Sequence, residues 1–318
     1  MDFSSYKFRA SQTHLLMTGN IGITKNQEEE IKLLFDEKST GINVNGNKIK
    51  WTPNKDEKLK DLLSKQKDKE LPKTMQSELR KVHRAEKYNR NFNFTNKFTQ
   101  KGIVQEDEAI TLYQNYLNRN GNIVLFTKNE TRLNNAYISG LPDINPTLLN
   151  GVKTGFDVKS SWELETLPFE SDPLISAYEW QNQSYCWLTD SEEWITASCL
   201  VNIHEHGLNN EKLKYFYALG SPSSYEDEYY DEYVTRCKEI EVRLIFDYDL
   251  FVERYPYHNL EMSRSEWMET INPTTGEKGY DINMVDRVVE KKTVFDPMKI
   301  EELKERIEIA RKYLTNLK

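Results

Sequence analysis

The sequence predicts a mixed α/β (α+β) fold, in which helices cover a central sheet of parallel and antiparallel strands. Three observations predict it. After residue 100, segments with helical and strand-like apolar spacing follow the order helix, three strands, helix, strand. The chain has 318 residues, 37% of them apolar, which suffices for one elaborated domain or two. A strand and a long helix are expected to close the chain.

The first hundred residues are predicted to be basic and mostly helical. Apolar spacing, with a proline between the last two segments, indicates three helices, at 25–38, 54–70 and 73–89. Residues 40–51 alternate around an Asn-Gly pair, which is the pattern of a β-hairpin. The polar, aromatic stretch 89–102 is expected to be a loop and the boundary to a second region.

Residues 101–318 are predicted to hold the central sheet and its covering helices. The expected strands are 122–127, 135–144, 151–162, 194–203, 212–220 and 286–295. The expected helices are 106–121, 172–189, 225–244 and 296–317, the last with Asp296 as N-cap and Pro297 at its first position. The stretch at about 205–285 is acidic and is expected to be an insertion.

Charge is distributed unevenly along the chain, whose net charge is −8. Residues 1–100 carry 20 Lys and Arg against 13 Asp and Glu, whereas residues 101–318 carry 23 against 38. The Lys-rich stretch 48–90 is consistent with a grip on duplex phosphates, and equally with a pair of solvated helices that bind nothing. The acidic run 225–232 is expected to be a solvated helix rather than a partner site.

Neither a membrane span nor an export signal is predicted. No window approaches the roughly 18 uninterrupted apolar residues of a membrane helix, and the N-terminal MDFSSYKFRA lacks an apolar signal core. The three cysteines, Cys186, Cys199 and Cys237, have neither metal-site spacing nor the even number of a disulfide framework. We therefore expect a cytoplasmic protein in a reducing environment.

Two acidic residues and a lysine interrupt the predicted strands 135–144 and 151–162. Asp143 ends the first strand in GLPDI, and Asp157 and Lys159 lie in the second, in DVKSS. Residues two apart in a strand point to the same face, so Val158 faces a core and offers only its backbone carbonyl. Because adjacent strand ends lie close together, the two carboxylates are expected to share one ion. Hard oxygen ligands suit Mg²⁺, with Mn²⁺ as a substitute.

Such a cluster predicts metal-dependent hydrolysis of a phosphodiester. Lys159 would orient the attacking water or stabilise developing negative charge, and desolvation beside a metal would lower its pKa toward the range for proton transfer. The structural alternative is a buried Asp-Lys ion pair beside a Pro-Asp turn, which a lone D-x-K favours. His204 and His206 in NIHEHG are a weaker signal, because two metal-type ligands lack a third.

The order of these motifs resembles the PD-(D/E)XK nuclease superfamily. Its elements are matched by G-x-P-D at Asp143, by D-x-K at Asp157 and Lys159, and by Gln181-x-x-x-Tyr185 in the following helix. The last element resembles the RecB-type branch of that superfamily.

A narrower resemblance points to phage lambda exonuclease and the YqaJ-type viral recombinase nucleases. Residues 177–189, AYEWQNQSYCWLT, are similar to the family helix that carries Q-x-Q and W-x-T. KGIVQEDEAITLY resembles the family's upstream helix and implies that Glu106, with Glu108 as the fallback, is a metal ligand. RASQTHLL resembles a segment whose serine, here Ser11, helps to hold a 5′-phosphate.

The resemblance implies a set of site residues. The metal ligands would be Glu106, Asp143, Asp157 and the Val158 carbonyl; the catalytic residues Asp143, Asp157, Lys159 and Gln181; and the DNA contacts Arg9, Ser11, Ser160, Gln183 and Tyr185. This sequence departs from the family pattern in three ways. Asp157 stands where Glu is commoner, the gap between Asp143 and Asp157 is longer, and no arginine clearly takes the phosphate-anchoring position ahead of Ser11.

The fold implied by the resemblance is restriction-endonuclease-like, with 1–100 as a DNA-contacting part or insertion and 101–318 as the nuclease core. The implied activity is a Mg²⁺-dependent, processive 5′→3′ exonuclease on linear duplex DNA, acting in phage-type recombination in the host cytoplasm. The resemblance also implies a ring-shaped homo-oligomer and a single-strand annealing protein as partner. Three cysteines rule out the four-cysteine iron–sulfur cluster of some relatives.

Two other functions stay open at this point. The first is an endonuclease with the same chemistry, either a restriction or a structure-specific enzyme, which would also cut closed circular DNA. The second is a DNA-binding or assembly protein whose site is silent, which would degrade no DNA at all.

Overall fold

The computed structural model describes residues 1–318 except 20, 44, 69–70, 91–95, 122, 271–278 and 318. The chain divides into two compact units. Unit 1 comprises Met1–Phe92, Asn135–Ile138 and Pro297–Lys318, and unit 2 comprises Asn93–Asn134 and Ser139–Asp296. The terminal helix, which we expected to belong to the nuclease core, is therefore grouped with the N-terminal residues.

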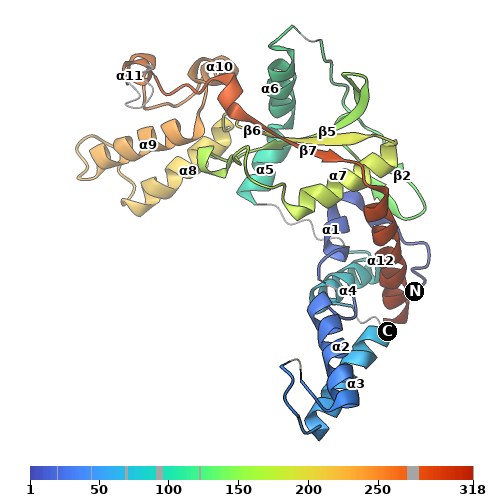
Figure 1. Ribbon diagram of the computed structural model, residues 1–318. Helices are drawn as coiled ribbons and strands as arrows, with labels where there is room; N and C mark the ends of the chain where they lie inside the picture. Colours follow the sequence, from blue (N-terminus) through green and yellow to red (C-terminus); the bar gives the residue numbers. More distant parts are fainter. Residues whose placement is uncertain are drawn as a thin grey trace. The chain divides into compact units, whose positions relative to one another are not determined.

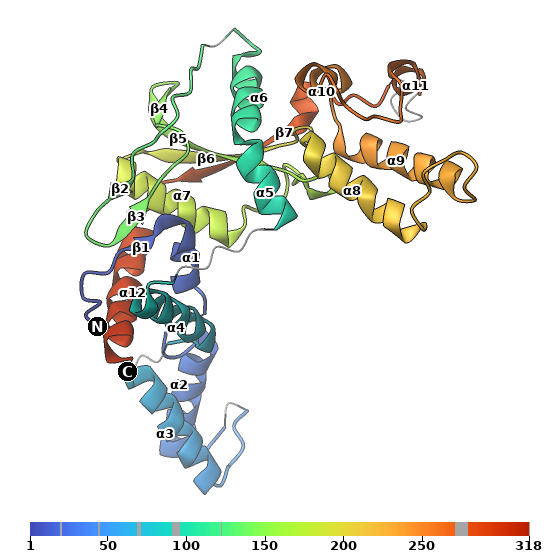
Figure 2. The ribbon, with the colours of Figure 1, turned by 180° about the vertical axis from the view of Figure 1, so that it is seen from behind.

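Unit 1 is mainly helical, as its sequence predicts. Its elements are β1 (Phe8–Arg9), a 3-10 turn (Ala10–Gln12), α1 (Thr13–Leu16), α2 (Lys25–Thr40), α3 (Pro53–Asp68), α4 (Lys73–Tyr88) and α12 (Pro297–Asn316). Helix α12 begins at Pro297 and buries Leu303, Ile307 and Leu314 on one face. That face explains the grouping, because α12 packs against α1 and α4 (Figure 2).

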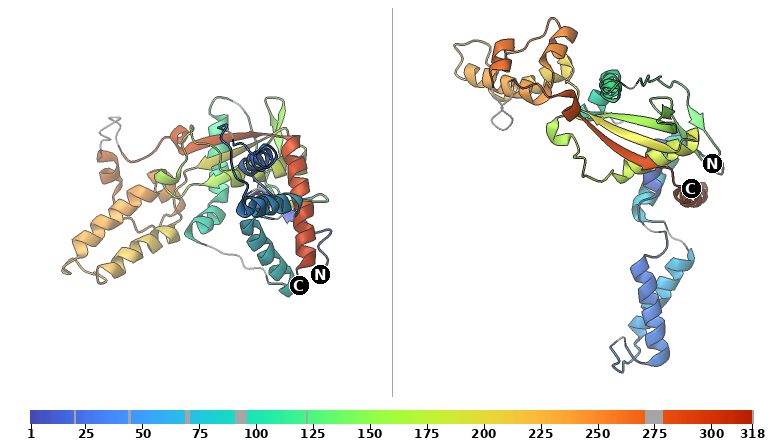
Figure 3. Two further views of the ribbon diagram at one scale, coloured as in Figure 1. Left: turned by 60° about the horizontal axis from the view of Figure 1, so that its bottom comes forward. Right: turned by 45° about the horizontal axis from the view of Figure 1, so that its top comes forward.

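Helices α2 and α3 lie side by side (the dark-blue and lighter-blue helices at the lower end of the right-hand view in Figure 3). Their small core consists of Ile31, Leu34, Leu59 and Leu62. The expected hairpin at 40–51 is reduced to one antiparallel bridge between Ile42 and Lys48 in the described residues. Gly46 makes that turn with a φ of 78°, a left-handed value that favours glycine.

Unit 2 contains a four-stranded mixed sheet in the order β4-β5-β6-β7. The strands are β4 (Thr147–Leu149), β5 (Val152–Ser160), β6 (Glu193–Cys199) and β7 (Val288–Val294). Strand β5 runs parallel to β6 and antiparallel to β4, and β7 runs antiparallel to β6. Helix α6 (Glu106–Asn118) and helix α7 (Ser176–Thr189) pack on the two faces of this sheet (Figure 1). The predicted mixed α/β fold is therefore confirmed.

The two faces of β5 differ in chemistry. Phe156 and Val158 belong to an apolar core together with Tyr113 of α6. Because side chains alternate along a strand, Asp157 and Lys159 face the opposite side, toward α7. That side is polar as well: the Asn182 amide of α7 donates hydrogen bonds to Thr196 (2.8 Å) and Thr293 (3.0 Å). One face thus anchors the strand, and the other presents charged groups.

The acidic insertion is a helical subregion rather than part of the sheet. Its elements are α8 (Glu205–Ala218), α9 (Tyr230–Leu244), α10 (Tyr248–Arg254) and α11 (Arg264–Glu269), and α8 lies beside α9 (Figure 2). The predicted strand 212–220 is wrong, because it forms the second half of α8. A short apolar run fits both periods, and here it continues a helix whose N-cap is His204. Gly207 donates its N–H to His204 Nδ1 at 3.0 Å, which gives that histidine a structural role.

Three further expectations need correction. The described residues of 122–127 form no strand, and 135–144 contributes only β3 (Ile138–Gly140), paired antiparallel with β2 (Leu133–Asn134). The expected loop 89–102 contains the start of α5 (Lys97–Val104), because Asn96 and Thr99 form a capping box. Short 3-10 turns at Leu164–Thr166 and Met284–Arg287 complete the elements. Among the described helices, none is long and apolar enough to cross a membrane.

Gly155 makes a close approach within the sheet that only glycine permits. A Cβ at this position would lie 2.1 Å from ring carbons of Trp194, the fully buried residue opposite it on β6. The Trp194 ring in turn lies 5.1 Å, centroid to centroid, from that of Tyr185 on α7. A side chain at 155 would therefore displace the packing beneath α7.

We expect Gly155→Ala to lower the free energy of unfolding by about 1–3 kcal/mol, the usual cost of an overpacked core. Gly102→Ala is the matched control, because a Cβ at Gly102 in helix α5 meets nothing within 4 Å. Alanine there is expected to be neutral or stabilising. Chemical denaturation of both variants is the measurement. Equal stabilities would contradict the packing described for Trp194.

Candidate active site

The Asp157 carboxylate is the centre of the polar face of β5. It is only 2% exposed. Lys159 Nζ lies 2.9 Å from Oδ1, to which it donates, and 2.8 Å from Oδ2. Gln181 of α7 donates from Nε2 to Oδ1 at 3.0 Å. Oδ2 is buried and receives no hydrogen bond of acceptable geometry in the described residues, so it retains coordinating capacity.

Asp143 lies on a loop that is held by main-chain contacts. Asn129 donates its N–H to the Asp143 carbonyl and its side-chain amide to the Pro142 carbonyl, both at 2.9 Å. The Tyr185 hydroxyl lies 3.3 Å from the Leu141 carbonyl, to which it donates. Asn129 is a positioning residue that the sequence analysis missed, since nothing in its local pattern shows that it bonds across thirteen residues to Pro142. Tyr185 therefore helps to position the loop that carries Asp143.

The acidic groups affect one another electrostatically. Burial, with the charges of Asp157 and Glu106, raises the pKa of Asp143 to about 6. Burial by itself would lower the pKa of Lys159, but the hydrogen-bonded Asp157 carboxylate and Asp143 raise it above its ordinary value. Desolvation therefore acts in the predicted direction but is outweighed by the two carboxylates, and the predicted effect of a metal on this pKa stays a prediction. The negative charges of Asp157 and Glu106 both favour the protonated form of Asp143.

Helix α6 supplies two acids, and the structure gives them different surroundings. Glu106 Oε1 lies 3.1 Å from the Nζ of Lys128, the residue that precedes Asn129 in the chain. Glu108 instead pairs with Arg254, and burial raises its pKa. The Glu106 charge thus acts on Asp143, whereas Glu108 forms an ion pair with the helical insertion. The assignment of Glu106 as a metal ligand stays a prediction.

The donor set fits a hard divalent cation. Three carboxylates with mutual repulsion, one of them with a buried oxygen that receives no hydrogen bond among the described residues, are chemically suited to Mg²⁺. In the described part of the chain, no three His, Cys, Asp or Glu side chains are already gathered closely enough to hold a metal. Lysine ammonium groups neutralise two of the carboxylates instead, Lys159 that of Asp157 and Lys128 that of Glu106. Occupation of the site would require these ion pairs to loosen.

The other four predicted DNA contacts are Ser160, Gln183, Arg9 and Ser11. Ser160 alternates with Lys159 and therefore belongs to the face of β5 that carries Val158. Gln183 is 2% exposed, and its amide donates to the Val294 carbonyl and accepts from the Asp296 N–H, so it attaches α7 to the C-terminal end of β7. Arg9 and Ser11 are exposed residues of unit 1. Their roles at DNA stay predictions.

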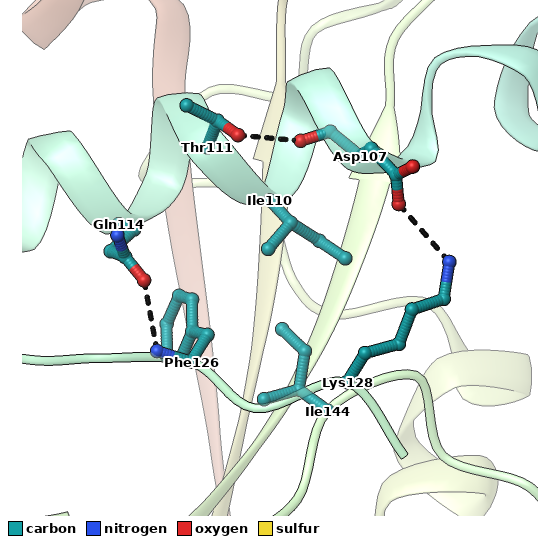
Figure 4. Close-up of a pocket in the computed structure, with 7 residues that line it drawn as sticks. All are labelled: Asp107, Ile110, Thr111, Gln114, Phe126, Lys128 and Ile144. Atoms are coloured by element: carbon teal, nitrogen blue, oxygen red, sulfur yellow. Dashed lines mark hydrogen bonds and ion pairs between the residues drawn. The ribbon is translucent and has the colours of Figure 1, made fainter. Parts of the chain in front are cut away.

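An open pocket of about 240 Å³ lies beside helix α6 (Figure 4). Ile110, Phe126 and Ile144 supply its apolar walls, with Asp107, Thr111, Gln114 and Lys128 at its polar positions. The Lys128 ammonium lies 3.0 Å from Asp107 and also pairs with Glu106. None of the proposed metal ligands lines this pocket, so it is a neighbour of the acidic cluster rather than the cluster itself.

Lys101 is a buried lysine that the sequence analysis also missed. It is 1% exposed, and Nζ donates to the carbonyls of Ser161 (2.8 Å) and Trp162 (3.0 Å) directly after β5. The ammonium also lies 5.8 Å from the Trp162 ring centroid. Burial lowers the pKa of Lys101 to about 7. This lysine fixes the end of the strand that carries Asp157 and Lys159.

We expect the stability of the protein to depend on the protonation of Lys101. Its pKa in the folded state is about 7, below the unfolded value of about 10.4, so between these pH values the unfolded chain binds one proton more. Raising the pH from 7 to 9 should stabilise the wild type relative to Lys101→Met by roughly 1–3 kcal/mol. Unfolding curves over this pH range test it, and parallel pH profiles would refute it.

Comparisons with known proteins agree with the architecture. No family model matches the chain, and no curated protein matches it either. Among solved structures, a phage-related exonuclease from Haemophilus somnus 129PT is similar, with a TM-score of 0.53 and 20% sequence identity. The match covers 98% of this chain and 94% of that chain. The predicted resemblance is thereby confirmed at the level of structure: this chain has the fold of a phage-related exonuclease.

Proposed function

We propose that the protein is a Mg²⁺-dependent deoxyribonuclease that hydrolyses DNA phosphodiesters, acting as an exonuclease on linear duplex. The observation that carries this proposal is the Asp157 carboxylate, buried in mid-sheet and contacted by Lys159 and Gln181. A buried ion pair contributes little stability compared with apolar packing, so its placement is better explained by chemistry. The likeness in fold to a phage-related exonuclease supports the same activity.

Each residue has a distinct role in this proposal. Glu106, Asp143, Asp157 and the Val158 carbonyl would hold Mg²⁺ or Mn²⁺, which would polarise the scissile phosphate as a Lewis acid. Lys159, with its raised pKa, stays an ammonium at neutral pH and stabilises negative charge that develops on the phosphate. Gln181 keeps the Asp157 carboxylate oriented. The Tyr178 ring, whose centroid lies 5.4 Å from Lys159 Nζ, confines that ammonium.

The finer properties rest on the resemblance of the motifs. They are 5′→3′ polarity, recognition of a 5′-phosphate by Ser11 and Arg9, a ring-shaped homo-oligomer, and a single-strand annealing partner in phage-type recombination. A location in the host cytoplasm is proposed on the same basis. Each of these properties can be refuted without refuting the hydrolysis of DNA phosphodiesters.

The activity is tested on end-labelled DNA. Linear duplex, with and without a 5′-phosphate, and covalently closed circles are incubated with the protein in Mg²⁺ and in EDTA. We expect mononucleotide release from linear duplex only, and only with Mg²⁺, because an exonuclease needs an end. Cleavage of closed circles would show that the protein is an endonuclease rather than an exonuclease. Failure to degrade any DNA in Mg²⁺ would refute the proposal that it is a nuclease.

The division of roles between Asp157 and Lys159 predicts different defects. Lys159→Ala should retain Mg²⁺ binding and lose cleavage by at least about 100-fold, the usual effect of removing a group that stabilises developing charge. Asp157→Ala should lose both, because it removes ligand oxygens. Calorimetric metal titration and DNA degradation are the two measurements. The control is Lys238→Ala on α9, which removes an ion pair with Glu266 that is partly exposed on both sides and should leave both properties intact. Wild-type rates from either site variant would refute the assigned roles.

A further inference from the structure

Helix α4 of unit 1 has a buried apolar face and a separate exposed basic face. Met75, Leu79 and His83 are buried where the helix packs against α1 and α12. On the exposed side, residues spaced alternately by four and three positions form one row, here named the α4 stripe: Lys73, Ser77, Arg80, Arg84 and Lys87. At 100° per residue, this row is centred roughly 120° round the helix from the buried face. Its basic side chains therefore point away from the core of unit 1.

The charges of the α4 stripe are not neutralised within the described part of unit 1. Lys73 and Arg84 have no carboxylate within ion-pair distance among the described residues. Arg80 donates from Nε to the neutral Tyr313 hydroxyl at 3.2 Å, and Lys87 lies 5.9 Å from the Tyr88 ring centroid. The acids of α4 are used elsewhere, Glu78 with Lys81 at 2.6 Å and Glu86 with the Tyr6 hydroxyl.

Helix α3 differs in this respect, although it has as many basic residues as α4. Lys55 pairs with Glu37 at 2.7 Å, Lys58 with Glu30, and Lys60 with Asp56 at 3.0 Å. The Lys55 and Lys58 pairs, together with Lys38–Asp56, join α3 to α2, whereas the Lys60 pair lies within α3. The lysines of α3 thus stabilise a helical pair, and the unneutralised positive charge lies on α4. The sequence alone left the whole stretch 48–90 as one candidate.

We infer that the α4 stripe is a binding surface for the sugar-phosphate backbone of duplex DNA, additional to the metal site. The row extends for about 21 Å at 1.5 Å per residue, and duplex DNA carries one negative charge per about 1.7 Å of its axis. Arginine binds phosphate oxygens in a bidentate manner, and a serine hydroxyl such as that of Ser77 donates to them as well. The stripe contains no aromatic or amide side chain, so it recognises phosphates without reading bases. DNA, rather than another polyanion, follows from the proposed nuclease function.

The test compares two triple variants that change net charge equally. Lys73→Gln/Arg84→Gln/Lys87→Gln removes three charges from the stripe, and Lys55→Gln/Lys58→Gln/Lys60→Gln removes three paired charges from α3. Binding of a fluorescent duplex is measured in EDTA, which blocks cleavage, over about 50 to 200 mM salt. The stripe variant should bind at least about tenfold more weakly, with a log–log salt slope smaller by about 2–3, or about 0.9 per lost phosphate contact. The α3 variant should keep the wild-type slope.

Further variants separate charge from folding. Lys73→Arg/Arg84→Lys/Lys87→Arg keeps the charges and should retain wild-type binding. If the glutamine triple variant does not fold, the three single variants decide, each with an expected slope change of about one. Equal slopes for the stripe and α3 variants would overturn the inference. Stripe-dependent binding without Mg²⁺-dependent cleavage would preserve the inference and refute the proposed function. A wild type that binds no DNA would overturn both.

Discussion

The arrangement of unit 2 depends on one interaction, the contact of the Asp157 carboxylate with Lys159 Nζ and Gln181 Nε2 inside the sheet. A carboxylate that is 2% exposed needs a compensating charge or hydrogen bonds, because desolvation of an unpaired ion costs several kcal/mol. Lys159 supplies the charge from the same strand, two residues away. Gln181 supplies the hydrogen bond from α7, so the packing of α7 on the sheet and the orientation of the carboxylate are coupled.

The surrounding structure keeps this group in place from several directions. Gly155 allows the Trp194 ring to lie against β5, and Trp194 packs on Tyr185, whose hydroxyl reaches the loop before Asp143. Asn129 closes that loop from the other side, and Lys101 holds the main chain beyond β5. Asn129 contacts the main chain of Asp143, and the others act through packing or through the main chain. They position two carboxylates whose mutual repulsion would otherwise separate them.

Local periodicity explains what was predictable from the sequence. Alternation along the strand predicts Asp157 and Lys159 on one face of β5, whereas Gln181 of α7 is indicated only by the resemblance of the motifs. The contributions of Asn129 and Lys101 were not predictable, because each bonds to backbone carbonyls far away in the chain. The segment 212–220 was assigned to a strand, since its apolar run does not distinguish the two periods. The grouping of α12 with unit 1 is set by tertiary packing that no local pattern reports.

Asp143 and Asp157, with Glu106, are proposed to form a site for a divalent cation. The most direct measurement is anomalous X-ray diffraction from crystals of the wild-type protein soaked in Mn²⁺. The account predicts an anomalous peak about 2.0–2.6 Å from oxygens of Asp143 and Asp157, the range for hard divalent cations, with Lys159 withdrawn from the metal-facing oxygen. A fully soaked crystal with no peak there, and with the Lys159–Asp157 pair still closed, would contradict it.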